Sequence, residues 1–386
     1  MSPRVLLFTG KGGVGKTTVA AATAAHAARR GLKTLAVSIG TAHSLSDALG
    51  GPGEIAPGLR LHQVDTQRSL EEHWDELSGH TSGLLGELGL DEITAEEVTV
   101  LPGAEEVIAL LELQAHVRSG DWDVVVVDCA PTAATLRLLA LPEALDRHAG
   151  RLLPVGRRLL KTVAPFVRGI APDDGLLQAA ERLHQGIRDV RELLTGPDAS
   201  VRLVLTPEAV VLAETGRALT SLNLYGYRVD AVVANRVFPA GSTDPWSTGW
   251  ARAQAGLLAE AGQSFAPLPV HVLPYLPAEP IGADTLAEAG AALYGDGDPF
   301  APPSVPPPLR LSADELRLAL PGAERGEVDL ARKGEELIVT AGPYRRIIAL
   351  PASLTRRKVA SAVLQDGFLQ VRFVSDRPPA PGGPDD

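Results

Sequence analysis

A glycine-rich loop near the N-terminus restricts the fold more than any other feature of the sequence. Residues 10–18 read Gly-Lys-Gly-Gly-Val-Gly-Lys-Thr-Thr, which matches the pattern G-x-x-x-x-G-K-[ST]. An apolar run at residues 5–8 precedes the loop, and an alanine-rich segment at residues 18–30 follows it. This order of buried strand, loop and helix is the context in which the pattern binds phosphate. It therefore predicts a phosphate-binding loop rather than a glycine turn with a chance Gly-Lys-Thr.

The residues of this loop have separate tasks in binding a nucleotide. Glycines let backbone N–H groups turn toward phosphate oxygens, and the positive end of the following helix adds to the attraction. Lys16 is expected to reach the β- and γ-phosphates of ATP, and Thr17 to bind Mg²⁺ through its hydroxyl group. The predicted nucleotide-binding residues of the loop are Gly10, Lys11, Gly12, Gly13, Val14, Gly15, Lys16, Thr17 and Thr18.

The rest of the first 298 residues alternates between strand and helix patterns. Further strands are predicted at residues 34–38, 59–64, 123–128, 201–205, 230–235 and 270–273, with helices at 209–222 and 251–261. Such alternation is typical of a parallel sheet covered by helices. Two longer helix-rich stretches, about 67–119 and 144–194, are expected to form a helical subdomain above the sheet. We predict one α/β domain with a phosphate-binding loop over residues 1–298.

A proline-rich stretch marks the end of this domain. Residues 299–308 contain six prolines, a composition that predicts a stiff linker. Short alternating runs follow at residues 316–320, 327–330, 336–339, 344–350 and 368–374, and glycine turns separate them. This pattern predicts a small all-β sandwich over residues 309–375. Residues 376–386 are rich in proline and glycine and are expected to be disordered.

Composition restricts the partners and the compartment. The formal net charge is −11, which argues against nucleic acid as a partner because that needs a basic face. Cys129 is the single cysteine, so an intramolecular disulfide and a thiolate-pair metal site are excluded, and a reducing cytosol is favoured. No signal-peptide pattern follows Met1, and no apolar run reaches the ~18–20 residues of a membrane span. We expect a cytoplasmic protein without an integral membrane segment.

Asp128 closes the predicted strand at residues 123–128. Its position relative to the loop is that of a Walker B carboxylate, which holds Mg²⁺ directly or through water. The alternative is an aspartate that only caps the following turn.

Several segments together resemble the ArsA/Get3 family of deviant Walker A ATPases. The loop carries a second lysine, Lys11, and residues 42–48 (AHSLSDA) resemble the switch I segment of the family. Residues 128–139 (DCAPTAATLRLL) resemble its switch II, and Asn235 before Arg236 resembles its adenine-reading asparagine. This resemblance covers residues 4–295. The segment after the linker resembles the small heat-shock-like (α-crystallin) domain appended to some bacterial members.

The resemblance implies an ATP- and Mg²⁺-dependent ATPase that works as a nucleotide-switched dimer. Lys11 would cross the dimer interface to the partner's nucleotide, the alternative being a solvated lysine beside the phosphates. Asn235 would contact adenine, and the catalytic residues would be Lys11, Lys16 and Asp128. In this family, helices above the nucleotide form a groove for client helices. The amphipathic residues 152–167 would line such a groove or form a lid packed on their own domain.

The sequence departs from the family at two places. Gly40 stands where the family has the aspartate that positions the attacking water, and loss of such a group commonly costs ~10²–10⁴ in rate. We therefore expect nucleotide binding with weak hydrolysis, unless Asp47 substitutes. Residues 238–250 lack the C-x-x-C pair through which two subunits share zinc, so no zinc is expected. Trp246 and Trp250 in that region pack across a dimer or, more simply, are buried within one subunit.

Three functions remain open at this point. The favoured one is a chaperone-like ATPase, a homodimer or a heterodimer with a paralogue, that couples its nucleotide state to a hydrophobic or protein client. The second is a non-hydrolysing partner subunit of an intact paralogue that supplies the missing aspartate. The third, a positioning ATPase of the MinD/ParA type, is weakest because the chain ends in an acidic, proline-rich tail. Arsenite recognition by thiolates is not supported by a single cysteine, and Cys129 is expected to be a packed residue rather than a redox switch.

Overall fold

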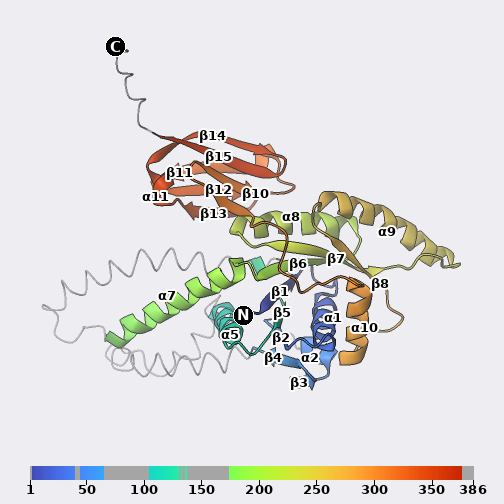
Figure 1. Cartoon of the computed structure of the whole chain (residues 1–386). Helices are drawn as coiled ribbons and strands as arrows, with labels where there is room; N and C mark the ends of the chain where they lie inside the picture. Colours follow the sequence, from blue (N-terminus) through green and yellow to red (C-terminus); the bar gives the residue numbers. More distant parts are fainter. Residues whose placement is uncertain are drawn as a thin grey trace, which may run out of the picture.

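A computed structural model describes residues 2–39, 44–64, 104–129, 132, 135–136 and 174–375. The described chain consists of an α/β domain and a β-sandwich that lies against it (Figure 1). This architecture confirms the predicted fold class. The tail after Ser375, residues 152–167 and most of the two predicted helix-rich stretches lie outside the described residues.

The α/β domain is built on one eight-stranded sheet with the order β3-β4-β2-β5-β1-β6-β7-β8. Its strands are β1 (Arg4–Thr9), β2 (Thr34–Ser38), β3 (Gly53–Ala56), β4 (Leu59–Gln63), β5 (Val124–Asp128), β6 (Ala199–Leu205), β7 (Val229–Val237) and β8 (Val270–Pro274). Neighbouring strands are parallel except β3, which pairs antiparallel with β4 at the sheet edge. The central strands β1 and β5 are buried along their whole length, because parallel sheets are covered on both faces and read as continuous apolar runs.

Helices cover both faces of this sheet. The helices are α1 (Lys16–Arg29), α2 (Ser44–Leu49), α5 (Ala104–Arg118), α7 (Asp174–Thr195), α8 (Ala209–Tyr225), α9 (Pro245–Ser264) and α10 (Ala283–Tyr294). The right-handed rule for parallel crossovers puts α1 on one face and α7 and α8 on the other. The C-terminal helix α10 returns to the first face and packs along α1 (Figure 1). The alanine-rich side of α1 is fully buried there, so two helices and the sheet come into close contact.

The β-sandwich has two antiparallel sheets, one with the order β14-β15-β10-β9 and one with the order β11-β12-β13. Its elements are β9 (Leu309–Leu311), β10 (Glu315–Ala319), β11 (Val328–Lys333), β12 (Glu336–Ala341), β13 (Tyr344–Ala349), β14 (Arg357–Gln365) and β15 (Phe368–Ser375), with a 3₁₀ turn at Arg325–Glu327 and a short helix α11 (Ala352–Thr355). Every second residue of β10 and β12 is buried. This alternation is the expected mark of strands with one face on a core.

The β-sandwich is attached to the C-terminal end of α8. Leu224 of that helix is fully buried within the hydrophobic core of the sandwich. The buried Arg346 on β13 donates a hydrogen bond of 2.6 Å to the Leu224 carbonyl, which is one of the carbonyl groups that a helix end leaves without an intrahelical partner. The Thr220 hydroxyl also donates to the Pro321 carbonyl. These contacts join the two domains by both apolar and polar interactions.

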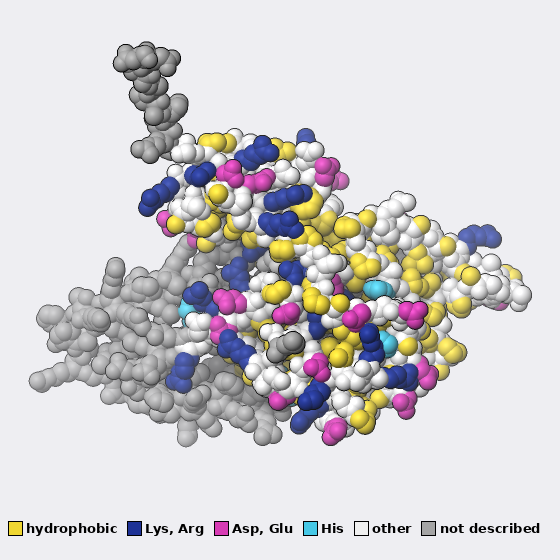
Figure 2. Space-filling model, viewed as in Figure 1, with side chains coloured by type: hydrophobic (Ala, Val, Ile, Leu, Met, Phe, Trp, Pro, Cys, Tyr) yellow, Lys and Arg dark blue, Asp and Glu magenta, His cyan; other side chains and the backbone are white. Residues whose placement is uncertain are grey.

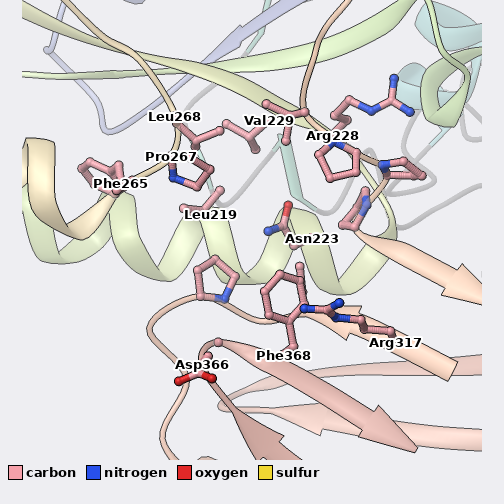
Figure 3. A pocket seen from close by; sticks show the side chains of 18 of the residues that line it. Leu219, Asn223, Arg228, Val229, Phe265, Pro267, Leu268, Arg317, Asp366 and Phe368 are labelled. Carbon is pink, nitrogen blue, oxygen red and sulfur yellow. The ribbon is translucent and has the colours of Figure 1, made fainter. Parts of the chain in front are cut away.

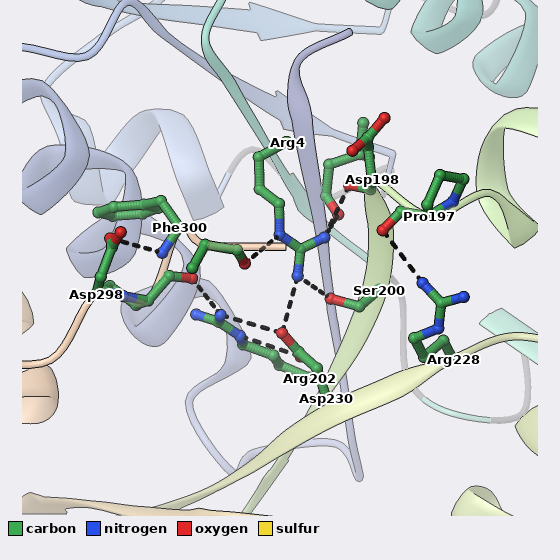
Figure 4. A network of polar contacts seen from close by, with 12 residues as sticks. Arg4, Pro197, Asp198, Ser200, Arg202, Arg228, Asp230, Asp298 and Phe300 are labelled. Atoms are coloured by element: carbon green, nitrogen blue, oxygen red, sulfur yellow. Dashed lines mark hydrogen bonds and ion pairs between the residues drawn. The ribbon is translucent and has the colours of Figure 1, made fainter. Parts of the chain in front are cut away.

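The proline-rich stretch packs on the α/β domain through a buried ionic network (Figure 4). Arg4 donates to Asp230 at 2.8 Å, and Arg202 donates to the same carboxylate at 3.2 Å. Arg4 also donates to the Ala301 carbonyl at 3.3 Å, and Arg202 donates to the Pro299 carbonyl at 2.5 Å. Burial lowers the pKa of Arg4 to about 10, so Arg4 stays charged at neutral pH. The network therefore ties β1, β6, β7 and the start of the linker together.

Candidate nucleotide-binding site

The predicted site residues meet at one edge of the central sheet. The glycine-rich loop follows β1, Asp128 ends β5, and Asn235 lies near the end of β7. All three strands are parallel, so these positions share the carboxyl edge. In open α/β sheets, ligands bind outside the carboxyl ends of the strands.

Two glycines let the loop take its path. A Cβ atom at Gly10 would lie 2.1 Å from the Val204 carbonyl oxygen, so no larger residue fits there. Gly15 has a φ of +85° and directly precedes α1. The N-cap residue of α1, Gly15, has no side chain that could cap the helix, and the first turn contains no acidic residue. Its free N–H groups and the helix dipole therefore form an anion-binding position at the end of the loop.

Lys16 lies inside this loop with its residue surface largely buried. Its ammonium group donates a hydrogen bond of 3.1 Å to the Lys11 carbonyl. Burial lowers the pKa of Lys16, whereas the charge of Asp128 opposes that shift. A bound phosphate would give this ammonium a stronger, charge-assisted partner than the backbone carbonyl.

Asp128 has the features of a cation ligand. Its Oδ1 atom is buried and has no hydrogen-bond partner among the residues that the structure describes. Burial raises the pKa of Asp128 to about 6, and the Thr17 hydroxyl and Lys16 counteract that effect. A buried carboxylate oxygen left unpaired is costly, and Mg²⁺ favours hard oxygen ligands such as carboxylates and hydroxyls. The adjacent Thr17 and Asp128 therefore fit the Mg²⁺ position predicted from the sequence.

Asn235 holds the glycine-rich loop in place through side-chain hydrogen bonds. Its side-chain amide donates 2.8 Å to the Val14 carbonyl, and its oxygen accepts from the Arg236 backbone N–H at 2.9 Å. The same amide nitrogen would lie 2.3 Å from a Cβ atom at Gly15. Asn235 thus holds the conformation of the loop, a role that the sequence analysis did not assign to it.

Two charged residues that sequence reasoning did not single out also contact the glycine-rich loop. Arg236, in the left-handed region with a φ of 57°, donates 3.0 Å to the Gly13 carbonyl. Glu214 on α8 lies 3.7 Å from the Lys11 ammonium, and both side chains are partly exposed. The Asn235-Arg236 pair gave a local signal for the first contact. The second depends on tertiary packing and has no signal in the sequence.

The switch segments are described only in part. Residues 40–43, which include Gly40, lie outside the described residues, as do Ala133 and Ala134. The Thr132 N–H donates 3.2 Å to the Gly10 carbonyl, and the Thr9 hydroxyl lies 3.1 Å from the Thr135 hydroxyl. The residues after Asp128 are therefore bonded directly to the base of the loop.

Comparison with known proteins places these features in a family. A family model described as Anion-transporting ATPase matches residues 3–295. The chain belongs to the ArsA family of ATPases. A second model, described as an HSP20-like domain found in ArsA, matches residues 312–373, which agrees with the predicted small heat-shock-like domain.

Relatives in the ArsA family align with nearly the whole chain. A protein of Chlorobaculum tepidum named "Putative arsenical pump-driving ATPase" is 35% identical, and the alignment covers 96% of each chain. One of Aquifex aeolicus with the same name and the number 1 is 31% identical over 91% of this chain and 95% of its own. An uncharacterized protein of Streptomyces coelicolor is 36% identical over 97% and 98%. The resemblance deduced from the motifs is thus confirmed for both domains.

The region that lacks C-x-x-C in this ArsA-family chain carries an aromatic cluster instead. Phe238 stacks on Trp250 and Tyr275 with ring centroids 6.0 and 5.3 Å apart, and it meets Trp246 edge-on at 5.5 Å. Trp246 and Trp250 are 65% and 42% exposed. The simpler expectation, burial within one subunit, is wrong for both tryptophans, because their ring contacts with Phe238 leave both side chains exposed. Hydrophobic side chains are visible over this side of the molecule in Figure 2.

The described part of the chain sets two further limits. Of its helices, none combines the length and apolar character needed to cross a membrane. The Cys129 thiol is buried, and burial raises its pKa well above the usual range. A thiol in this state is a poor nucleophile and a poor metal ligand.

Proposed function

We propose that this ArsA-family protein is a Mg²⁺-dependent ATPase that acts as a dimer and couples its nucleotide state to binding of a hydrophobic or protein client. The observation that carries the proposal is the Asp128 carboxylate, buried beside Lys16 and Thr17 with one oxygen unpaired. An ATP-bound Mg²⁺ would satisfy that oxygen. The family match over residues 3–295 supports the ATPase activity in general.

The residues of the site divide the work of binding ATP. Lys16 and the first-turn N–H groups of α1 would hold the β- and γ-phosphates, and Asn235 keeps the loop in the shape that presents those groups. Thr17 and Asp128 would hold Mg²⁺, which neutralises charge on the phosphate oxygens when bound. Gly40 supplies no group to orient the attacking water, so we propose slow turnover.

Dimerisation is supported by two exposed features near the nucleotide site. Lys11 pairs with Glu214 of its own chain at 3.7 Å, and its side chain is 39% exposed. A surface ion pair of this kind is worth only ~0–1 kcal/mol, so Lys11 can exchange it for a phosphate of a partner's nucleotide. Trp246 and Trp250 are also exposed, on the helix that follows β7, and aromatic residues are enriched at protein interfaces.

The client is proposed to be hydrophobic or proteinaceous rather than arsenite. Several relatives are named as arsenical pump-driving ATPases. Capture of arsenite by thiolates would need more than one cysteine, and Cys129 is the single one, buried with a raised pKa. The adjoining β-sandwich, matched by an HSP20-like model, offers a second surface for a protein partner.

A non-hydrolysing role is the second candidate, and Gly40 is the observation that favours it. In that case the protein would bind Mg²⁺-ATP as the partner subunit of a paralogue that supplies the missing aspartate. A positioning ATPase of the MinD/ParA type is the weaker alternative, because the net charge of −11 provides no general attraction to DNA or anionic lipid.

Steady-state phosphate release tests the enzymatic part of the proposal. Wild-type protein should release phosphate slowly with Mg²⁺-ATP, Lys16→Ala should abolish the release, and Gly40→Asp should raise it by roughly 10²-fold or more. Asp47→Asn serves as a control for the other nearby carboxylate. Absence of wild-type turnover together with intact Mg²⁺-ATP binding and rescue by Gly40→Asp would establish the non-hydrolysing role instead.

Light scattering coupled to size-exclusion chromatography tests the dimer. We expect a mass change between ADP and ATP in wild-type protein that is lost in Lys11→Ala. Glu214→Gln should favour the ATP dimer because it frees Lys11 from its intrachain partner. A mass that is unaffected by nucleotide in all three proteins would contradict the nucleotide switch.

A further inference from the structure

A cavity of about 290 Å³ lies between the two domains (Figure 3). One wall is formed by α8 and the start of β7, and the opposite wall by the β-sandwich, with the proline-rich linker at one side. The cavity reaches β7 at Val229, whereas Asn235 of the nucleotide site lies toward the other end of that strand. At 3.3 Å per residue, the two positions are ~20 Å apart. The cavity is therefore a different site from the nucleotide-binding loop.

The walls of this cavity are mainly apolar and stiff. Leu219, Val229 and Phe265 contribute side chains from the α/β domain, and three consecutive prolines at positions 306–308 contribute the linker side. Proline has a fixed φ and no N–H group, so this wall is rigid and has few polar atoms. A concave apolar pocket with a few polar groups is the usual form of a small-molecule site, and its volume is at the lower end of the range for such sites.

Two polar side chains that line the cavity carry donor groups for which no hydrogen bond is found among the described residues. Arg317 on β10 has a buried Nε atom without a hydrogen-bond acceptor, and its guanidinium group lies over the Phe368 ring at 4.0 Å from the centroid. This stacking fixes the plane of the guanidinium. Asn223 on α8 is buried and lines the cavity from the opposite domain, and no hydrogen bond of its side chain is found among the described residues. Figure 3 shows Asn223 on α8 and, on the side of the β-sandwich, the Arg317 side chain next to Phe368.

The electrostatic environment of the cavity is positive although the whole chain is acidic. Arg228, Arg310 and Arg317 line the cavity, with Asp366 as its one acidic side chain. Arg228 is 9% exposed, and its Nε atom is also buried without an acceptor, while another of its nitrogens donates 3.1 Å to the Pro197 carbonyl. The guanidinium groups of Arg310 and Arg317 outnumber the Asp366 carboxylate around the cavity, so an anionic ligand is favoured over a cationic one.

We propose that this cavity binds a small organic acid, with its carboxylate on Arg317 and Asn223 and its apolar body against Phe265, Leu219 and the prolines. The planar guanidinium fork matches a carboxylate in a bidentate geometry. The Asn223 amide supplies a further N–H donor from the opposite wall. The limited volume restricts the ligand to a compact body such as one aromatic ring. Because Asn223 and Arg317 belong to different domains, the bound acid bridges the domains.

Titration of 4-(trifluoromethyl)benzoate into full-length protein, followed by ¹⁹F NMR, tests this site. We expect saturable binding with a Kd on the order of 0.1–1 mM, as suits a ligand of this size. Arg317→Met keeps an apolar stem over Phe368 but removes the guanidinium, and it should weaken binding about tenfold or more. Arg372→Met, which changes an exposed arginine on β15 away from the cavity, is the matched control and should bind as wild type does. The neutral amide of the probe should bind at least about tenfold more weakly than the acid.

Two further measurements keep the proposal open to contradiction. Ala319→Leu fills the cavity without removing a charge, so it should also weaken binding, with circular dichroism used to confirm the fold. Probe binding should remain saturable in Lys16→Ala and in the presence of saturating Mg²⁺-ATP, and the nucleotide should not compete with the probe, which separates this site from the proposed ATPase. No saturation below about 10 mM, equal affinity in Arg317→Met, or displacement by Mg²⁺-ATP would overturn the assignment.

Discussion

At the scale of single residues, Asp128 shows how a binding site is maintained at a cost in stability. Its carboxylate is buried with one oxygen unpaired, and its pKa is raised to about 6. Because the folded-state pKa exceeds the ordinary value of 3.8, the protonated form stabilises the fold below that value. That stabilisation is lost as the pH rises through 6. At pH 7.5 the charged carboxylate therefore destabilises the nucleotide-free protein.

We predict that Asp128→Asn raises the stability of the nucleotide-free protein and removes its response to nucleotide. Neutralising this group should stabilise the fold by on the order of 2–3 kcal/mol at pH 7.5. Mg²⁺-ATP should raise the melting temperature of wild-type protein but not of the variant. Thermal unfolding with and without Mg²⁺-ATP measures both effects. Asp47→Asn, which changes an exposed carboxylate on α2, should behave as wild type, and equal stabilisation of Asp128→Asn by nucleotide would contradict the assigned Mg²⁺ role.

At the scale of elements, the close contact of α1 with α10 buries an imidazole between them. His26 of α1 lies with its ring centroid 6.0 Å from the rings of Tyr294 and Phe300. Neither of its ring nitrogens has a hydrogen-bond partner in the described part of the chain. Burial lowers the pKa of His26, and Arg30 and Arg29 add to the effect. The helix pair therefore accepts the neutral imidazole and disfavours the charged one.

This environment predicts an acid-sensitive helix pair. The folded-state pKa of His26 lies below the ordinary value of 6.5, so its neutral form stabilises the fold above pH 6.5, and that contribution is lost as the pH falls below it. The free energy of unfolding of an Asp128→Asn variant, which lacks the opposing titration of Asp128, should decrease when it is measured with urea from pH 7.5 down to pH 5. His26→Leu added to this variant should reduce the slope. A remaining slope is expected from His116 and His271, since burial also lowers their pKa values. An identical slope in the double variant would contradict the assignment.

The limits of sequence reasoning are also visible at the level of elements. The loop-forming glycines, the buried parallel strands and the alternating strands of the sandwich each follow a local pattern, and the structure confirms them. β14 is an edge strand with most of its residues exposed, so its sequence carries no clear alternation and it was missed. α9 begins at Pro245 with Asp244 as its cap, six residues before the predicted start at 251. The cap and the first-turn proline are recognisable start signals, but the first two turns consist of weak helix formers, so the sequence pattern indicated a later start.

The site shows the same division between local and tertiary signals. Lys16, Thr17 and Asp128 come together as predicted, because the spacing of the motif and the parallel strand order place them at one edge. The hydrogen bond from Asn235 to Val14 joins residues 221 positions apart, and the Lys11–Glu214 pair depends on how α8 packs. No local pattern encodes either contact. The interdomain cavity likewise depends on the relative position of two separately predicted domains.

At the scale of the whole molecule, a single arginine connects the domains at a helix end. Arg346 donates 2.6 Å to the Leu224 carbonyl, where the negative end of the α8 dipole favours a cation. Burial of Leu224 in the core of the sandwich adds apolar contact at the same place. The two domains should therefore unfold together rather than one after the other.

We predict that Arg346→Met uncouples the two domains. Calorimetry of wild-type protein should show one cooperative transition, whereas the variant should show two, with the sandwich losing stability by about 1.5–3 kcal/mol because the hydrogen bond from a charged donor to the Leu224 carbonyl is removed. Arg345→Met is the matched control, since Arg345 is the exposed neighbour on the same strand. Two transitions in the wild type, or one in Arg346→Met, would contradict the coupling.

The position of α8 has a mechanical consequence. This 17-residue helix is ~25 Å long. Glu214 in its first half forms an ion pair with Lys11 of the glycine-rich loop, while Leu224 in its last turn is buried in the core of the sandwich. A helix of this length bends little, so a displacement of its first half along the helix axis also displaces its last turn. If a nucleotide removed Lys11 from Glu214, the first half of α8 would lose this contact. A resulting shift of the helix would move the appended domain at its other end.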